Sequence, residues 1–187
     1  MSDKSDFLKA VTVYHDSREQ INGHILDALG ALKVKHEIKK LDIADYSFTV
    51  AGRDFSLSCA IERKASVDEL YSNIMEGASG HKGERIEKEF EAAYRILNDF
   101  TVLIEGVGSM EELKAYKVAD WKMKASPQRV VSDIGVDCYE RLSSWQTGNR
   151  YNFRIELVRD PAQTAVKMLE RFYYYFRNYK KAVAPTR

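Results

Sequence analysis

A hairpin pattern near the middle of the chain constrains the fold more than any other stretch. Residues Tyr46–Val50 and residues 55–61 are rich in the β-branched and aromatic side chains that are typical of strands. Between them lie residues 51–54, in which Gly52 can adopt the positive φ of a tight turn. Because so short a connection can join only antiparallel neighbours, the sequence predicts a β-hairpin.

Strand patterns and helix patterns alternate along the rest of the chain. Short apolar runs typical of buried strands occur at residues 10–14, 34–38, 101–105 and 153–158. Helical patterns occur between and after them, at residues 23–32, 66–77, 84–97, 126–145 and 161–176. The 187 residues show no repeat and no obvious linker, so a single domain over residues 1–187 is expected. These patterns predict an α/β fold, in which helices flank both faces of a mixed central β-sheet that contains the hairpin.

Overall charge does little to define a partner. The formal net charge is +1, which argues against a strongly basic nucleic-acid-binding surface. Residues 161–187 hold six lysines and arginines against the single acid Glu170, a bias that suits either phosphate or a solvated helix face. Cys59 and Cys138 match neither a metal spacing nor a disulfide framework. Without an apolar leader or a membrane-length run, the sequence predicts a soluble protein of a reducing compartment, with no membrane partner.

The hairpin also brings charged residues together at one edge of the predicted sheet. Asp45 and Glu62 lie nearly equidistant from the turn, so folding the hairpin places them side by side. Side chains alternate along a strand, so Glu62 and Lys64 share one face while Arg63 points to the other. Two carboxylates can bind Mg²⁺ or Mn²⁺, and a lysine can orient or deprotonate a water. By spacing alone, a surface pair of Glu62 with Lys64 explains the pattern as well, and this alternative stays open.

Three short motifs, in order along the chain, give this cluster a recognisable form. They are DSRE at residues 16–19, ADY at residues 44–46 and IERKASVD at residues 61–68. Together they resemble the nuclease domain of the XPF family, a branch of the restriction-endonuclease-like PD-(D/E)XK superfamily, whose pattern is D-x-R-E, G-D-Y and V/I-E-R-K-x-x-x-D. The resemblance is close over residues 11–106, so residues 9–106 are expected to form the motif-bearing core. Residues 107–187 are expected to complete the fold with a strand and helices and to offer a dimer or DNA surface.

The chain departs from that family pattern in three places. Ala44 replaces the glycine of G-D-Y, a change without consequence unless the position needs a positive φ. Glu89 replaces a glutamine four residues after Arg85, in a helix motif that resembles one of the family. The tandem helix-hairpin-helix domain of eukaryotic and archaeal members is not found, so the resemblance implies a stand-alone form like those of phages and bacteria.

The resemblance implies a role for each charged residue of the motifs. Asp45 and Glu62 correspond to metal ligands of the catalytic site, and Lys64 corresponds to the catalytic lysine. Asp16 corresponds to a further acid that binds or organises the metal, which would be Mg²⁺ or Mn²⁺. The residues that would complete the site, by pairing with one another or with phosphate, are Arg18, Glu19, Arg63, Asp68 and Arg85.

By the same resemblance, the expected activity is that of a metal-dependent DNA endonuclease acting on branched, flap or Holliday-type DNA. Water would attack the phosphodiester and leave a 5′-phosphate and a 3′-hydroxyl. A homodimer would be compatible with this role, as would the cytoplasm of a bacterial or phage-infected cell, or the nucleus of a eukaryote. Two alternatives stay open: a non-catalytic DNA-binding subunit of a nuclease complex, and a Mg²⁺-dependent enzyme for a small phosphate ester.

Overall fold

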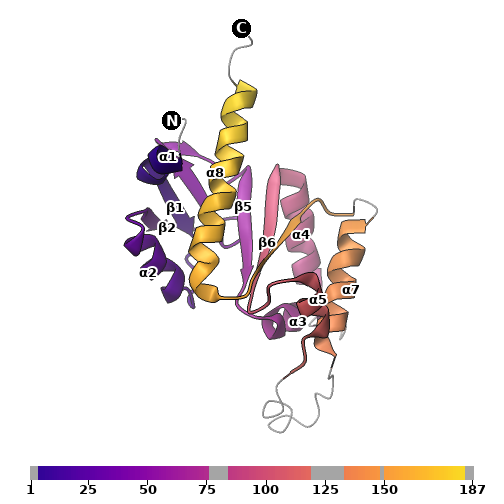
Figure 1. Cartoon of the computed structure of the whole chain (residues 1–187). Coiled ribbons are helices and arrows are strands. Elements are labelled where there is room, and N and C mark those ends of the chain that lie inside the picture. Colours follow the sequence, from indigo (N-terminus) through magenta and orange to yellow (C-terminus); the bar gives the residue numbers. More distant parts are fainter. Residues whose placement is uncertain (1–3, 76–83, 119–132, 148–149, 184–187) are drawn as a thin grey trace.

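A mixed β-sheet forms the centre of the molecule (Figure 1). The computed structural model describes residues 4–75, 84–118, 133–147 and 150–183. Within these ranges seven strands pair in the order β2-β1-β3-β5-β6-β7, and β4 pairs with the outer end of β3. The strands are β1 (Val11–His15), β2 (Lys35–Ile38), β3 (Tyr46–Val50), β4 (Arg53–Asp54), β5 (Cys59–Lys64), β6 (Asp99–Glu105) and β7 (Arg154–Val158). The prediction of a mixed sheet with a hairpin is confirmed.

The direction of the strands decides which residues meet. β1 runs parallel to β2, β3 runs antiparallel to both β1 and β5, and β5, β6 and β7 run parallel to one another. The carboxyl ends of β1, β5 and β6 therefore lie at the same edge of the sheet as the amino end of β3. Residues that follow β1, precede β3, or end β5 and β6 converge at this carboxyl edge.

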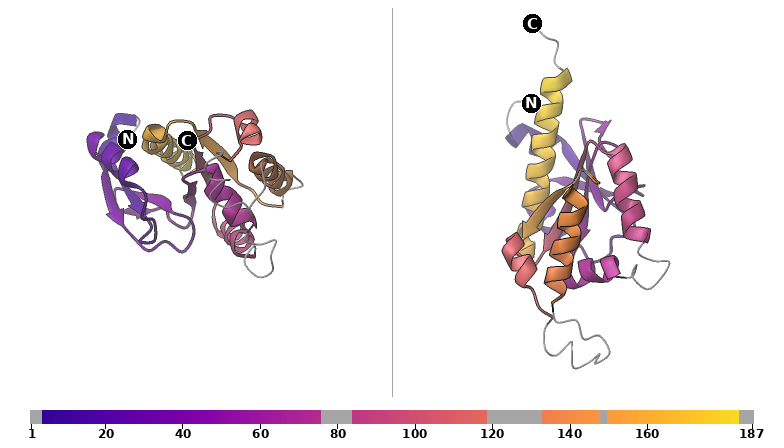
Figure 2. Two further views of the ribbon diagram at one scale, coloured as in Figure 1. Left: turned by 90° about the horizontal axis from the view of Figure 1, so that it is seen from below. Right: turned by 90° about the vertical axis from the view of Figure 1, so that its right-hand side faces the viewer.

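Helices cover both faces of the sheet, as the alternating pattern predicts. One face carries α1 (Lys4–Ala10), α2 (Gly23–Ala31) and α8 (Thr164–Val183), which follows a 3₁₀ turn at Pro161–Gln163. The other face carries α3 (Val67–Met75), α4 (Glu84–Ile96), α5 (Met110–Ala115) and α7 (Ile134–Gln146). In the right-hand view of Figure 2, α8 and α4 stand on opposite sides of the strands.

The core beneath α8 is aromatic. Phe48 of β3 stacks on Phe55 and on Phe172, with ring centroids 4.7 and 4.6 Å apart. Phe7 of α1 meets Phe48 edge-on at 6.2 Å. Such ring pairs add about 0.5–1.5 kcal/mol each beyond the apolar area that they bury. Phe172 of α8 is therefore a core residue.

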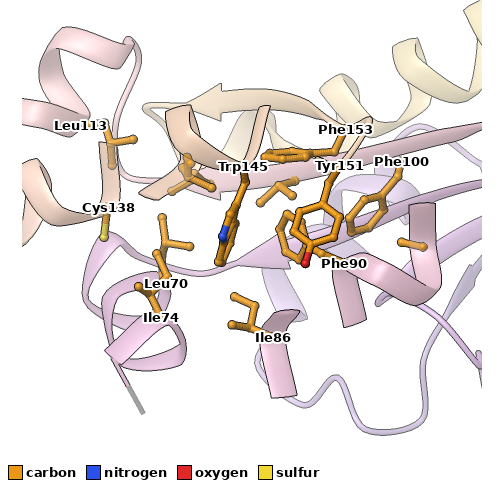
Figure 3. Packing of buried hydrophobic residues seen from close by; sticks show 14 of the residues in the cluster. Leu70, Ile74, Ile86, Phe90, Phe100, Leu113, Cys138, Trp145, Tyr151 and Phe153 are labelled. Carbon is orange, nitrogen blue, oxygen red and sulfur yellow. The ribbon is translucent and has the colours of Figure 1, made fainter. Parts of the chain in front are cut away.

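A second aromatic cluster lies on the opposite face of the sheet. Phe90 has its ring centroid 4.9 Å from Trp145, 5.3 Å from Phe100 and 4.9 Å from Phe153 (Figure 3). Tyr151 packs edge-on against Phe90 and Trp145. Because these rings come from α4, α7, β6 and the segment before β7, the cluster holds the last third of the chain to the motif-bearing core.

The hairpin itself is shorter than the sequence predicts. Its turn consists of Ala51 and Gly52 alone, with φ of 50° and 80°, and β4 follows at once. The Asp54 carboxylate then accepts the backbone N–H two residues later at 2.7 Å, and the chain bends out of the ladder. The strand predicted at residues 55–61 is therefore wrong at its start, since β5 begins only at Cys59.

At the ends that the structure describes, the remaining helices and strands agree with the sequence to within about three residues, except that α8 runs on to Val183, beyond the end predicted at residue 176. Two short helices, α1 and α5, were not predicted, because neither carries enough apolar residues to show a helical period. The helix end expected near residue 77 and the helix start expected at residue 126 lie outside the described residues. Among the helices that the structure describes, none is both long and apolar enough to cross a bilayer.

Candidate active site

Asp45 enters β3 next to a residue with a rare backbone conformation. Ala44 has a φ of 66°, in the left-handed region that favours glycine. The position does need a positive φ, so alanine there strains the backbone. Backbone hydrogen bonds then hold Asp45, whose N–H donates to the Ile61 carbonyl at 3.1 Å and whose carbonyl accepts the Asp16 N–H at 2.7 Å. Asp45 Oδ2 also accepts the backbone N–H of Arg63 at 2.8 Å, which places this carboxylate beside β5 as predicted.

Glu62 and Lys64 lie on one face of β5 and Arg63 on the other, as strand alternation predicts. Lys64 Nζ donates to Glu62 Oε1 at 2.7 Å. Only 5% of the Lys64 side chain and 12% of the Glu62 side chain are exposed. The two residues do pair, but inside the molecule, whereas the surface alternative required a solvated pair.

Burial and charge shift the pKa values of this group. Burial raises the pKa of Asp45, and the nearby Glu62 carboxylate raises it further. Burial lowers the pKa of Lys64, but the charge and hydrogen bond of Glu62 outweigh burial and raise it on balance. Lys64 is therefore a cation at neutral pH. Asp45 binds a proton more readily than an ordinary aspartate, and a divalent cation held by Asp45 and Glu62 would relieve the repulsion between them.

Arg63 points to the opposite face and binds three partners. Its Nε and Nη2 donate to the two carboxylate oxygens of Glu105 at 3.0 and 2.8 Å. Its Nη1 donates to Glu19 Oε1 at 2.7 Å and to the carbonyl of Ile21 at 3.0 Å. The side chain is buried, so the carboxylates of Glu19 and Glu105 balance a charge that water cannot solvate. Arg63 thereby ties the loop after β1 to both β5 and β6.

Glu105 is a residue of this site that the sequence did not identify. Besides Arg63, its Oε1 accepts the Thr164 hydroxyl at 2.6 Å and lies 2.9 Å from His24 Nε2. Burial raises the pKa of Glu105, but the hydrogen bonds from Arg63, Thr164 and His24 outweigh burial and lower it on balance. Its place at the end of the strand predicted at residues 101–105 was a usable signal, because parallel strands end at one edge. No local pattern marks His24 or Thr164, which belong to α2 and α8.

Asp16 joins two loops at the same edge. Its Oδ1 accepts the backbone N–H of Arg18 at 2.9 Å and its Nε at 2.6 Å, while Oδ2 accepts the Leu41 N–H at 2.7 Å. Burial raises the pKa of Asp16, but these hydrogen bonds outweigh burial and lower it. Its role as a metal ligand stays a prediction. Arg18 exposes 64% of its side chain and can meet a phosphate from solvent.

The other motif residues lie at the start of two helices. Asp68 is in the first turn of α3, where its Oδ2 accepts the Tyr116 hydroxyl at 2.6 Å. Arg85 is in the first turn of α4, and its side chain lies outside the described part of the structure. The predicted site residues that the structure brings to the carboxyl edge are Asp16, Arg18, Glu19, Asp45, Glu62, Arg63 and Lys64.

Asp45 and Glu62 are the residues best suited to hold a metal. Across the described ranges, no group of three or more His, Cys, Asp or Glu side chains forms a ready-made metal cluster. Mg²⁺ does not require one, because it is usually bound by one or two carboxylates while water and substrate phosphate complete its shell. Two carboxylates, one with its pKa raised by the other, therefore fit a hard cation such as Mg²⁺ or Mn²⁺.

Comparison with known proteins links the chain to one family and one fold. The family described as the ERCC4 domain matches residues 15–170. No curated protein sequence matches the chain. A solved structure of XPF from Aeropyrum pernix is similar with a TM-score of 0.63 and 17% identity, over 94% of this chain and 66% of that one. A structure of XPF from Aeropyrum pernix in complex with DNA gives a TM-score of 0.57 and 17% identity, over 89% of this chain and 66% of that one.

The family match covers every residue of the candidate site. At 17% identity the structural likeness shows the fold, and the chain spans slightly less than two thirds of either XPF chain. The family match is longer than the motif-bearing core, since it runs from the last residue of β1 into α8. It therefore includes Glu105 and Thr164 as well as the residues that the motifs predicted.

Proposed function

Since the chain belongs to the ERCC4 domain family, we propose that it is a structure-specific DNA endonuclease whose active site is the edge around Asp45, Glu62 and Lys64. The observation that carries the proposal is the convergence of these three residues at one end of the sheet. Hydrolysis of a phosphodiester requires a positioned water and groups that neutralise the charge developing on the phosphate. Two carboxylates and a buried lysine are suited to that task.

Each residue of the site would have a separate part in phosphodiester hydrolysis. When bound, the cation would activate water and polarise the scissile phosphate. Asp45 and Glu62 would hold it, and the hydrogen bond from Arg63 N–H keeps the Asp45 carboxylate in place. Lys64, with its raised pKa, would supply positive charge toward the phosphate rather than remove a proton from water. The guanidinium group of Arg18 would bind a phosphate oxygen from the solvent side.

The substrate that we propose is branched, flap or Holliday-type DNA. The likeness to a structure of XPF in complex with DNA supports a DNA substrate. Water attack that expels the 3′ oxygen would leave a 5′-phosphate and a 3′-hydroxyl. Action as a homodimer, in the cytoplasm or the nucleus, belongs to the same proposal.

A non-catalytic DNA-binding subunit is the second candidate. Such a subunit has no need of a buried lysine paired with one carboxylate, nor of a second buried carboxylate beside that pair. Asp45, Glu62 and Lys64 are all present, and their burial costs folding free energy that a binding module would have no reason to keep. We therefore favour the enzyme.

The deciding experiment is cleavage of end-labelled linear, flap and four-way DNA in Mg²⁺, Mn²⁺ or EDTA. The wild type is expected to cut branched DNA only with metal, and Asp45→Asn and Lys64→Ala are expected to be slower by about 10²- to 10³-fold. Lys4→Ala is the matched control, because Lys4 forms an ion pair with Glu170 at the amino end of α1, away from the carboxyl edge. Tight DNA binding without cleavage by the wild type would favour the binding subunit. Equal cleavage by all four proteins would reject the site.

A further inference from the structure

We propose that Glu105 is a positioning residue, which sets the geometry of the active-site strand through Arg63. The inference rests on the proposed function, because it concerns how the same site is held. Glu105 makes no contact with Asp45, Glu62 or Lys64 among the hydrogen bonds and ion pairs of the described residues, so it acts on them only through Arg63.

Three elements fix the Glu105 carboxylate. Arg63 of β5 binds both of its oxygens, and Thr164 at the start of α8 and His24 of α2 reach Oε1. The side chain of Glu105 is only 2% exposed, so no water competes for these partners. A buried carboxylate with this many partners has a single orientation, and it imposes that orientation on the guanidinium group of Arg63.

The backbone of Arg63 transmits this constraint to the site. Its N–H donates to Asp45 Oδ2, and its two neighbours in the chain are Glu62 and Lys64. A shift of Arg63 would move the donor to Asp45 and turn both neighbouring side chains, because the three residues share one stretch of strand. Displacements of about 1 Å in such a site can cost about 100-fold in rate, even when the altered residue lies away from the chemistry.

The rival explanation is that the Arg63–Glu105 pair only stabilises the fold and does not affect the geometry of the active site. The other end of β6 offers an internal control for that idea. Asp99, the first residue of β6, accepts hydrogen bonds on Oδ1 from Arg171 Nε at 3.0 Å and Nη2 at 2.6 Å. This pair joins the same strand to α8 with the same chemistry, but far from Asp45. If both pairs only stabilise the fold, the loss of either pair should lower Tm and leave kcat unchanged.

The test compares Glu105→Gln with Asp99→Asn in steady-state cleavage of a flap or four-way DNA, with kcat and KM measured separately and Tm measured alongside. Glu105→Gln is expected to lower kcat by about 10- to 100-fold and to leave KM within about twofold. Asp99→Asn is expected to keep kcat within about twofold, although both variants lower Tm. Thr164→Val, which removes one donor to Glu105, is expected to lower kcat by about three- to tenfold with a smaller change in Tm.

The outcomes separate the two proposals. Unchanged kcat in Glu105→Gln or Thr164→Val, with a lowered Tm, would show that Glu105 only stabilises the fold and would overturn the positioning role. An equal loss of kcat in Asp99→Asn would overturn it too, because the loss would then follow stability. If Glu105→Gln does not fold, Thr164→Val decides. A wild type that cleaves no DNA would reject the proposed function itself, and the positioning role would fall with it.

Discussion

The two ends of β6 carry the same kind of contact in opposite electrostatic settings. At the amino end, Asp99 binds Arg171, and Arg154 lies 3.9 Å from its second oxygen, so one carboxylate faces two guanidinium groups. At the carboxyl end, Glu105 binds Arg63, but acids outnumber bases around them. The acids there are Asp16, Glu19, Asp45, Glu62 and Glu105, and the bases are Arg18, Arg63 and Lys64.

The carboxyl end is therefore less favourable for stability than the amino end. Burial raises the pKa of Glu19 although Arg63 binds it, and burial together with Glu62 raises the pKa of Asp45. A chain selected for stability alone would remove such repulsion, because the ionised forms of Glu19 and Asp45 each cost folding free energy. Its retention at one end of the sheet is typical of a functional site, while the amino end shows how the same fold ties strands together without that cost.

The largest expected effect tests whether the two ends serve different purposes. Glu62→Gln, at the carboxyl edge, is expected to slow DNA cleavage by about 10³-fold. The substitution removes a negative charge that would hold the metal and that pairs with Lys64. Arg171→Leu, at the amino end, is expected to lower the free energy of unfolding by about 2 kcal/mol and to leave the cleavage rate within about twofold. Initial cleavage rates and urea unfolding of both variants provide the measurements.

The second prediction is that metal binds at the carboxyl end of β6 and not at its amino end. Saturating Mg²⁺ is expected to raise the Tm of the wild type, by an amount equivalent to about 2.7 kcal/mol at 100 times Kd, and to leave Asp45→Asn unchanged. Asp99→Asn should respond to Mg²⁺ as the wild type does, since it lies at the other end. Thermal unfolding in EDTA and across a Mg²⁺ titration measures the effect. Equal shifts in the wild type and Asp45→Asn would remove Asp45 from the metal site.

In the metal-free protein, pH should reveal the cost of the Asp45 charge. Because the pKa of Asp45 is raised in the folded state, its ionised form lowers stability at neutral pH, so Asp45→Asn is expected to be more stable there. As pH falls through that raised pKa, folded wild type takes up a proton that the unfolded chain does not yet bind, and the advantage of the variant shrinks. Asp16 and Glu105, with lowered pKa values, lose their contribution as pH falls in both proteins, so they cancel in the difference. An advantage that grows toward acid pH would contradict this account.

The smallest expected effect concerns the two ends of β3. Ala44 precedes the strand with a φ of 66°, and Ala51 follows it with a φ of 50°. Glycine at either position is expected to raise the free energy of unfolding by about 0.5–1 kcal/mol, since relief of left-handed strain exceeds the entropy cost of glycine. Cleavage by Ala51→Gly should match the wild type. Ala44→Gly should stay within about threefold, because three hydrogen bonds hold Asp45 in place. A larger loss would show that strain at Ala44 helps to aim Asp45.

Those parts of the site that depend on near neighbours in the chain could be predicted from the order of the residues. Side chains alternate along any strand, so the opposite directions of Lys64 and Arg63 followed from their order alone. A hairpin with a short turn brings its two ends together, so the position of Asp45 beside β5 also followed. Asp16, Arg18 and Glu19 lie just after β1, and their place in the site was predicted from the resemblance of the motifs to the XPF family.

Tertiary structure alone decided the partners that come from distant parts of the chain. Arg63 and Glu105 are 42 residues apart, and Thr164 is 59 residues beyond Glu105, so no periodic pattern could link them. The burial of the Glu62–Lys64 pair likewise depends on how the rest of the chain packs around the end of β5. Contacts of this kind are set by the packing of the whole sheet and its helices, and strand and helix periodicity carries no signal for them.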